Sequence, residues 1–235
     1  MISVLLAAHR GEDHIAAQIA SILPQLDEHD ELLVADDSPP EHTATREIVL
    51  SFEDPRVRYM AGPRQGVVKN VEFLLGQARG ERLVLSDQDD VWLPGKLAAT
   101  RERLPAAKPA LLLHDAHLTD AQLRKTGQTL FATRAAKPGL WRNLARNSYT
   151  GCCMAFTKEL LPYILPFPKR IPMHDQWIGL RAEACGQVQF LAEPLLLWRR
   201  HENTQTGGAG SVAQKIKWRA AMALALIITA MKGRF

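Results

Sequence analysis

Three carboxylates stand within four residues, at Asp87, Asp89 and Asp90, directly after a short apolar run. That run, residues 83–85, is of the kind that forms a buried strand, and the acids follow its carboxyl end. Carboxylates so close together repel one another unless a positive charge lies among them, and hard divalent cations prefer oxygen ligands. The pattern therefore predicts a Mg²⁺ or Mn²⁺ site beside a phosphorylated ligand. The alternative is a solvated acidic turn, with Asp90 capping residues 91–104.

The chain before these acids alternates between short apolar runs and amphipathic segments. Strands are expected at residues 3–8, 31–35 and 57–60, and helices at residues 13–26, 41–52 and 67–78. Such alternation predicts an α/β fold with a mostly parallel central sheet flanked by helices. Because ligands of such sheets bind at the carboxyl ends of the strands, we expect His9, Asp36 and Asp37 on the same rim as the acids. Neither a dinucleotide-binding glycine motif nor a Walker loop occurs.

Composition limits the classes of function. The 235 residues are 46% hydrophobic, which is enough for a full core and argues against global disorder. The net charge of +4 is unevenly spread, because residues 199–235 hold seven Lys or Arg and one Glu. A basic tail on a slightly acidic body argues against nucleic acid as a partner, which would need a basic face with interleaved aromatics. Three cysteines, two of them adjacent, form no disulfide pattern, so we expect a reducing cytoplasmic location.

The second half of the chain has weaker patterns. A strand is expected at residues 110–120, a polar loop at 123–137 and a last strand at 195–200. His114 and His117 stand on the first of these strands, but their spacing points them to opposite faces, so a structural role is favoured over a metal site. Gly151 is a place where backbone could approach a substrate closely, and the alternative there is an ordinary buried strand.

Several segments together resemble one known family. The family-2 glycosyltransferases have segments similar to Gly11-Glu12, Asp36-Asp37-Ser38, Gly66-Val-Val-Lys-Asn70 and Ser86-Asp-Gln-Asp-Asp-Val-Trp-Leu-Pro94. Within that family the chain resembles the bacterial rhamnosyltransferase branch, from about residue 2 to about residue 207. The resemblance implies a nucleotide-diphospho-sugar transferase (GT-A-like) fold in residues 1–207. Its nucleotide-binding half would be residues 1–104 and its acceptor-binding half residues 110–207.

The resemblance also implies roles for individual residues. Asp175 falls where the family keeps its catalytic carboxylate, and a carboxylate can take the proton from an attacking hydroxyl. The alternative for Asp175 is a helix cap. The metal is expected on Asp89, as the second acid of an Asp-x-Asp motif, and on His201. Contacts with the nucleotide-sugar donor are expected from ten residues: Ala7, His9, Glu12, Asp36, Lys69, Asn70, Asp87, Gln88, Arg199 and Arg200.

The implied reaction is an inverting transfer of a sugar from a UDP- or dTDP-linked donor to a hydroxyl of a glycan or lipid-linked acceptor. Rhamnose as the sugar, and a role in cell-surface polysaccharide synthesis, follow from the resemblance only. Asp36 is expected beside the nucleobase and Asp87 beside the ribose or the sugar. The family often has an aromatic residue in place of His9 and Gly-Ser in place of Ser38-Pro39, so the nucleobase stays open. Residues 204–211 are expected to form a flexible lid.

Residues 208–235 are expected to form a flexible loop and then a basic amphipathic helix at 212–232. The apolar part of this helix, residues 220–231, is shorter than the roughly 20 residues that span a bilayer. With Lys and Arg at both ends, the helix could make a peripheral contact with the inner face of the cell membrane. It could equally pack on the body of the protein or on a second subunit of a homodimer.

Three other functions stay open at this point. A metal-dependent nucleotidyltransferase could use the same sheet and the same acids without needing Asp175. A non-catalytic nucleotide-sugar-binding protein would bind the donor with metal and turn nothing over. A membrane-surface adaptor would depend on residues 212–235.

Overall fold

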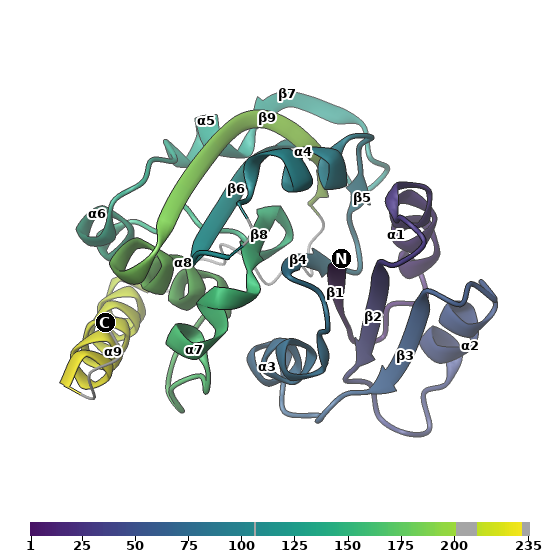
Figure 1. Ribbon diagram of the computed structural model, residues 1–235, viewed down its shortest axis with the longest axis horizontal. Helices are drawn as coiled ribbons and strands as arrows, with labels where there is room; N and C mark the ends of the chain where they lie inside the picture. The colour runs from purple at the N-terminus through teal and green to yellow at the C-terminus, as the bar shows by residue number, and fades with distance from the viewer. Residues whose placement is uncertain (106, 201–210, 232–235) are drawn as a thin grey trace.

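The computed structural model describes residues 1–105, 107–200 and 211–231, and Figure 1 shows their arrangement. His201 and nearly all of the expected lid lie outside these residues, so neither prediction is tested. The first half of the chain forms β1 (Ile2–Ala8), α1 (Ile15–Ile22), the 3-10 helix η1 (Leu23–Gln25), β2 (Glu31–Asp36), α2 (Ala44–Leu50), β3 (Val57–Ala61), α3 (Val67–Gln77) and β4 (Arg82–Asp87). Each of these elements lies within a few residues of the segment that the sequence predicts.

The second half is more irregular. It forms β5 (Val91–Trp92), α4 (Lys96–Arg103), β6 (Ala110–Thr119), β7 (Lys125–Thr129), α5 (Leu130–Arg134), α6 (Leu140–Ala145), η2 (Gly151–Cys153), β8 (Met154–Thr157), η3 (Lys158–Leu160), α7 (Leu161–Ile164), α8 (His174–Cys185), β9 (Gln187–Arg199) and α9 (Val212–Met231). Two predictions are wrong. Residues 123–137 contain β7 and α5 where a loop was expected, because pairing with β6 orders this polar segment. Asp90 caps no helix, because β5 follows it and α4 begins only after Gly95.

The described strands form one nine-stranded sheet in the order β3-β2-β1-β4-β8-β6-β9-β5, with β7 paired to β6. The four strands of the first half are parallel, as predicted. Downstream, β8 runs antiparallel between β4 and β6, and β5 runs antiparallel to β9. The α/β class is confirmed, with a mixed sheet whose parallel part lies in the first half of the chain.

The crossovers of the first half create a switch point in the sheet. The chain steps outward from β1 through β2 to β3 and then returns to place β4 on the other side of β1. Because such crossovers are right-handed, α1 and α2 cover one face of the sheet and α3 covers the other. The direction of winding therefore reverses between β1 and β4, and α/β sheets bind ligands outside the carboxyl ends of strands at such a point.

The C-terminal helix α9 packs on the body of the protein. Its buried side chains, Met222, Ala225 and Leu226, belong to the hydrophobic core cluster, and α9 lies beside α6 (Figure 1). Within the described parts of the chain, no helix combines the length and the apolar character needed to cross a membrane.

Candidate active site at the carboxyl ends of the strands

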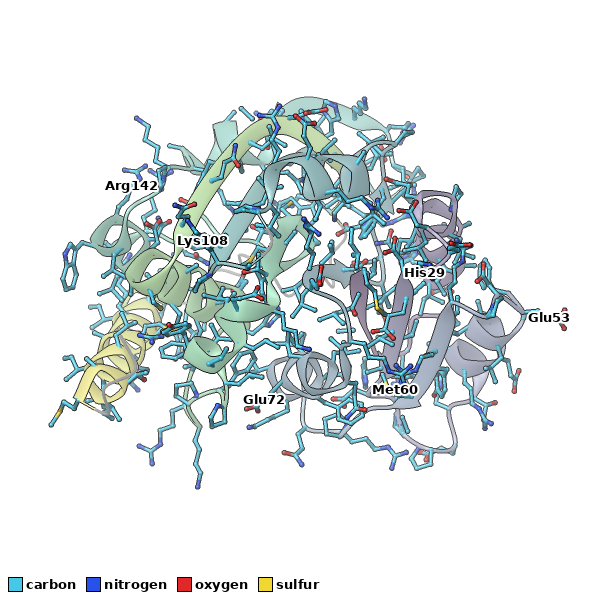
Figure 2. All side chains as sticks on the ribbon, in the orientation of Figure 1. His29, Glu53, Met60, Glu72, Lys108 and Arg142 are labelled. Carbon is cyan, nitrogen blue, oxygen red and sulfur yellow. The ribbon has the colours of Figure 1, made fainter. Side chains whose placement is uncertain are left out.

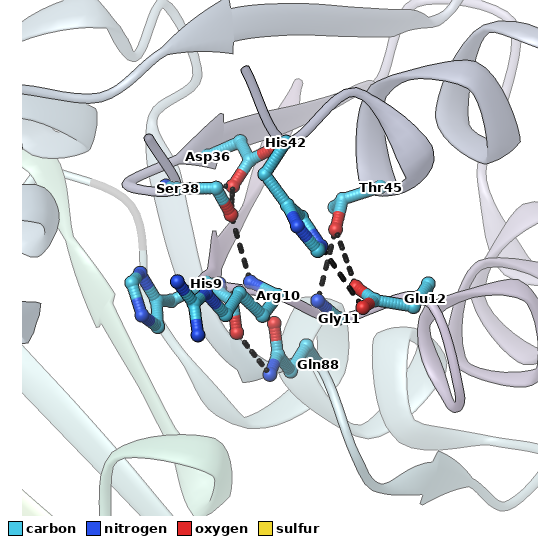
Figure 3. Close-up of polar contacts among 9 residues, drawn as sticks. All are labelled: His9, Arg10, Gly11, Glu12, Asp36, Ser38, His42, Thr45 and Gln88. Carbon is cyan, nitrogen blue, oxygen red and sulfur yellow. Dashed lines mark hydrogen bonds and ion pairs between the residues drawn. The ribbon is translucent and has the colours of Figure 1, made fainter. Parts of the chain in front are cut away.

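One side chain joins the ends of β1 and β4. Gln88 follows β4, and its Nε2 donates to the His9 carbonyl (3.0 Å) while its Oε1 accepts the His9 N–H (2.8 Å) (Figure 3). Gly11 passes so close that a Cβ there would lie 2.5 Å from Gln88 Oε1, so any larger residue would displace the Gln88 amide. Ala7 lies opposite Asp87 in the ladder between the two strands. The turns that follow β1 and β4 are thus tied together, and the His9 side chain is exposed beside them.

Acidic side chains organise the end of β2. Asp36 Oδ1 accepts the N–H (3.0 Å) and the hydroxyl (2.5 Å) of Ser38, and its Oδ2 accepts the Tyr59 hydroxyl (3.2 Å). Ser38 in turn accepts the Arg10 N–H (2.8 Å), which joins the turns after β1 and β2 (Figure 3). Asp37 accepts two backbone N–H groups of the loop before α3, at 2.5 and 2.8 Å. The expected role of Asp36 beside a nucleobase stays a prediction.

Glu12 links the turn after β1 to the start of α2. His42 Nε2 lies 2.9 Å from Glu12 Oε1, and the Thr45 hydroxyl donates to Oε2 (3.2 Å) (Figure 3). The hydrogen bond from His42 is the main cause that lowers the pKa of Glu12, which therefore stays ionised at neutral pH. Thr45 also accepts the Gly11 N–H (2.9 Å). The Glu12 side chain is 31% exposed, so it lines the rim while holding α2 in place.

The start of α3 also faces this rim. Asn70 is buried, and its Nδ2 donates to the Ala35 carbonyl (2.7 Å), which ties α3 to the end of β2. Lys69 lies 2.5 Å from Glu72, one turn along the helix, and Figure 2 labels Glu72 on α3. Glu72 also accepts the Phe167 N–H (2.6 Å) from the second half of the chain. Asn70 therefore shapes the rim from within, whereas the Lys69 side chain is 39% exposed.

The acids after β4 form a partly buried cluster. The carboxylates of Asp87 and Asp90 and the thiol of Cys152 lie within 4.8 Å of one another. Burial, followed by the charges of Asp89 and Asp175, raises the pKa of Asp87 to about 7. Burial and the charges of Asp87 and Asp89 raise the pKa of Asp90 well above its usual value. The buried Oδ2 of Asp90 has no hydrogen-bond partner among the described residues, so Asp90 is not solvated, whereas Asp87 and Asp89 are half-buried.

A buried lysine lies beneath the acids. Lys96 is 1% exposed, its Nζ donates to the Cys152 carbonyl (2.6 Å), and it stands 4.0 Å from the centre of the Trp92 ring. Burial lowers the pKa of Lys96 to about 8, and the charges of Asp90 and Asp87 oppose that shift. The ammonium is therefore still charged at neutral pH. No sequence pattern signalled this role, because a lysine at the start of a helix is ordinarily exposed.

The end of β9 brings Arg199 to the acidic turn. Its N–H donates to Asp90 Oδ1 (3.1 Å), its Nε donates to the Asp89 carbonyl (2.7 Å), and its Nη1 donates to a second backbone carbonyl. Arg199 is only 7% exposed, so in this arrangement it holds the turn in shape. Arg200 is exposed, with its guanidinium carbon 5.4 Å from the centre of the Trp198 ring. The contacts of both arginines with a donor stay predictions.

Asp175 comes from the second half of the chain. It stands in the first turn of α8, whose N-cap is Met173, so it is not the helix cap. Asp175 is 6% exposed, and its Oδ1 accepts the next backbone N–H (2.6 Å). Gly151 lets η2 approach closely, since a Cβ there would lie 3.1 Å from His174 Nε2 and 4.0 Å from Asp175 Cβ. The charge of Asp175 is one of the causes that raise the pKa of Asp87, so the two carboxylates act on one another.

The acids after β4 fit a hard divalent cation. A positive charge among their oxygens would partner the buried Oδ2 of Asp90 and relieve the repulsion that raises the pKa of Asp87. Carboxylate oxygens are the ligands that Mg²⁺ and Mn²⁺ prefer. The hydrogen bond with Cys153 and burial raise the pKa of Cys152 well above its usual value, so its neutral thiol is a poor ligand for such an ion. The fitting donors are thus the carboxylates.

Comparison of sequences gives a family and several relatives. Residues 3–164 match the profile of the family described as "Glycosyl transferase family 2". The UDP-Glc:alpha-D-GlcNAc-diphosphoundecaprenol beta-1,3-glucosyltransferase WfgD of Escherichia coli is 31% identical over 98 residues, covering 41% of this chain and 38% of WfgD. The dTDP-rhamnosyl transferase RfbG of Shigella flexneri is 22% identical over 233 residues, covering 90% of this chain and 77% of RfbG.

Comparison of structures gives the same fold. TarS 1–349 from S. aureus, in complex with UDP-GlcNAc, superposes with a TM-score of 0.70 at 19% identity, covering 96% of this chain and 65% of that one. Glucosyl-3-phosphoglycerate synthase from Mycobacterium tuberculosis, in complex with Mn²⁺, UDP and glucosyl-3-phosphoglycerate, superposes with a TM-score of 0.63 at 21% identity, covering 96% of this chain and 79% of that one. These structures confirm the predicted GT-A-like fold.

Proposed function

Because this chain belongs to glycosyl transferase family 2, we propose that it is an inverting, metal-dependent enzyme that acts on a nucleotide-diphosphate sugar. The observation that carries the proposal is that carboxylates from two distant parts of the chain act on one another. Asp87, Asp89 and Asp90 stand at the end of β4, Asp175 stands at the start of α8, and the charge of Asp175 acts on Asp87. A donor diphosphate at the end of β4 would present its sugar toward Asp175.

In the proposed reaction Asp175 accepts the proton of the acceptor hydroxyl while the hydroxyl oxygen bonds to the anomeric carbon of the sugar. The bond between that carbon and the diphosphate oxygen breaks, and the leaving nucleoside diphosphate takes the electron pair. Attack on the face opposite the leaving group inverts the anomeric configuration in a single displacement. The burial of Asp175 and its backbone hydrogen bond suit this role, because they fix the direction of the carboxylate.

Mg²⁺ or Mn²⁺ would be held by Asp89, with Asp87 and Asp90 beside it, and would neutralise the charge that develops on the leaving diphosphate. The Mn²⁺ and UDP in the solved structure of glucosyl-3-phosphoglycerate synthase support this choice of ion. Arg199 would keep the acidic turn in shape from the protein side. His201, the other proposed ligand, lies outside the described residues.

We propose a UDP- or dTDP-linked donor and a glycan or lipid-linked acceptor in polysaccharide synthesis. The activities named for WfgD and RfbG support both nucleotides, and that of RfbG supports rhamnose as the sugar. The exposed His9 would lie beside the nucleobase together with Asp36. Among the other proposed donor contacts, Gln88 and Asn70 bond to backbone carbonyls, so their part would be to shape the rim.

The test of this proposal is Asp175→Asn, assayed with UDP- and dTDP-sugars in the presence of Mn²⁺. Asparagine keeps the oxygen that accepts the backbone N–H but cannot take a proton, so the fold should persist while turnover falls by about 10²–10⁴-fold. Glu53→Gln is the matched control. It removes one exposed carboxylate that follows α2, at the edge of the molecule (Figure 2), and should leave turnover unchanged. Full activity of Asp175→Asn with an unchanged melting temperature would contradict the proposal.

The products of the same assay separate the other candidates. A nucleotidyltransferase would release pyrophosphate and attach a nucleotidyl group, and it would tolerate the loss of Asp175. A binding protein would be stabilised by donor and Mn²⁺ in a thermal-shift assay and would release no nucleoside diphosphate. Release of nucleoside diphosphate with a glycosylated acceptor of inverted anomeric configuration is the outcome that we expect.

A further inference from the structure

Helix α9 is buried along one face only. Met222, Ala225 and Leu226 are 0%, 7% and 6% exposed, and α6 lies against the helix (Figure 1). Their spacing of three and one residues places these three side chains on the same side of the helix. The remaining circumference of α9 faces away from the body of the protein.

That outward face is also apolar. Ile216, Leu224 and Ile227 are each 57% exposed, and Met231 is 82% exposed. Their spacings of eight, three and four residues align them along one side of the helix. At a rise of about 1.5 Å per residue this apolar face is about 22 Å long. Exposed apolar surfaces of this extent mark sites of interaction.

Helix α6 also exposes an apolar side chain and basic side chains. Trp141 is 76% exposed on this helix, which lies beside α9. Arg142 and Arg146 are also exposed on α6, and Figure 2 shows Arg142 at the outer edge of the molecule. Tryptophan favours the boundary between lipid and water, where its ring is apolar and its N–H stays hydrated.

The charges on this surface have one sign. Lys215, Lys217 and Arg219 are exposed on the first part of α9, and no acidic residue occurs from Val212 to Met231. In a parallel helix pair with a second copy of this chain, Lys217 would approach its own counterpart. In an antiparallel pair, the first part of α9 would approach the C-terminal end of the other α9, and Lys232 and Arg234 come directly after that end in the sequence. Like charges thus oppose self-pairing and favour an anionic partner.

We propose that the α6–α9 surface, formed by the exposed apolar and basic side chains named above, binds the interface of an anionic lipid bilayer. Helix α9 would lie in the plane of the membrane, with its outward apolar face among the acyl chains and its basic residues on the phosphates. This use agrees with the finding that the helix is unsuited to crossing the membrane. The inference stands apart from the proposed sugar transfer, since it invokes none of the same side chains.

The test is sedimentation of the protein with vesicles of phosphatidylcholine, alone or with phosphatidylglycerol, in the absence of any donor. We expect binding to the anionic vesicles only, weakened by salt. Leu224→Glu combined with Ile227→Glu, and separately Lys215→Glu combined with Lys217→Glu, should each weaken binding at least tenfold. Leu50→Glu is the matched control, because Leu50 is 52% exposed on α2, away from this surface, and its replacement should leave binding unchanged.

The other outcomes are equally specific. Because all the substituted side chains are exposed, every variant should melt at the wild-type temperature. If the Leu224→Glu and Ile227→Glu variant melts lower, Leu224→Ser combined with Ile227→Ser takes its place. Equal binding to neutral and anionic vesicles, or wild-type binding by both double variants, would overturn the proposal. A third outcome would also overturn it: the wild type binds no vesicles, and sedimentation velocity shows a dimer that Leu224→Glu combined with Ile227→Glu abolishes. The surface would then bind a second copy of the chain.

Discussion

Replacing Lys96 by methionine should test whether the protein supplies its own cation beneath the acidic turn. The substitution removes the ammonium, which is 1% exposed and bonded to the Cys152 carbonyl at 2.6 Å, and leaves a side chain of similar shape. A hydrogen bond from a charged donor is worth about 1.5–3 kcal/mol. Burial works in the opposite direction, because it lowers the pKa of Lys96 to about 8 and so penalises the ammonium in the folded state. We therefore expect a loss of no more than about 1.5–3 kcal/mol in the free energy of unfolding, from the lost hydrogen bond to Cys152.

The assay is urea unfolding at pH 7, followed by tryptophan fluorescence, without metal and with Mn²⁺. Mn²⁺ on the acids would replace part of the missing positive charge, so the deficit of Lys96→Met should shrink when the ion is added. Lys108→Met is the control, because the Lys108 side chain is exposed (Figure 2) and its loss should change stability by no more than about 0.5 kcal/mol. If Lys96→Met lies within about 1 kcal/mol of the wild type in both conditions, the ammonium does not compensate the acids and our reading of the cluster is wrong.

Two further predictions concern the same turn. The pKa of Asp87 is raised to about 7 in the folded state, so its contribution to stability is full below about pH 4 and is lost as the pH rises through 7. Asp87→Asn should therefore become steadily more stable than the metal-free wild type between pH 4 and 7, by up to about 1.4 kcal/mol per pH unit, and a constant difference in urea midpoints would contradict this. Arg199→Lys cannot bond to the carbonyls of both Asp89 and Ala121, and it should lose about 1.5–3 kcal/mol of stability. If Arg199 positions the turn, the Mn²⁺ concentration for half-maximal activity will rise more than the donor KM, whereas a direct donor contact would raise the donor KM first.

The parallel half of the sheet was predictable because its signals are local. Each strand from β1 to β4 is a short apolar run, and the helices between them have the period of an amphipathic helix. Strand β1 is buried over nearly all of its length, as expected for a central strand covered on both faces. The order of the strands then follows from handed crossovers, which also place the acids and His9 on one rim.

The elements that were missed have no local signal. Strand β7 is mostly exposed and polar, and it exists because it pairs with the edge of β6 near His117 and Thr119. Strand β5 has two residues, and its pairing partner, β9, is about a hundred residues away in the chain. In both places the pairing depends on the assembled sheet, which a window of sequence does not contain.

The roles of the polar residues at the rim are harder to predict from sequence, because the ends of the strands need hydrogen-bond partners of their own. Where parallel strands end, backbone carbonyls and N–H groups lose their ladder partners and need others. Gln88, Asn70 and Arg199 supply them, at His9, Ala35 and Asp89. The sequence shows which side chains at the rim can donate hydrogen bonds, but not whether the acceptor is a ligand or a backbone carbonyl. Predictions from sequence therefore assign too many of these side chains to a ligand.

The carboxylates can be sorted by the same reasoning. A carboxylate accepts hydrogen bonds only, so it can complete a turn by taking N–H groups but cannot satisfy a carbonyl. Asp36 and Asp37 have found such donors at the end of β2. Asp90 keeps a buried oxygen without a hydrogen-bond partner among the described residues, and Asp87 carries a pKa raised to about 7. Among these carboxylates, the unmet electrostatic demand therefore lies at the end of β4, which is where a cation and a diphosphate would satisfy it.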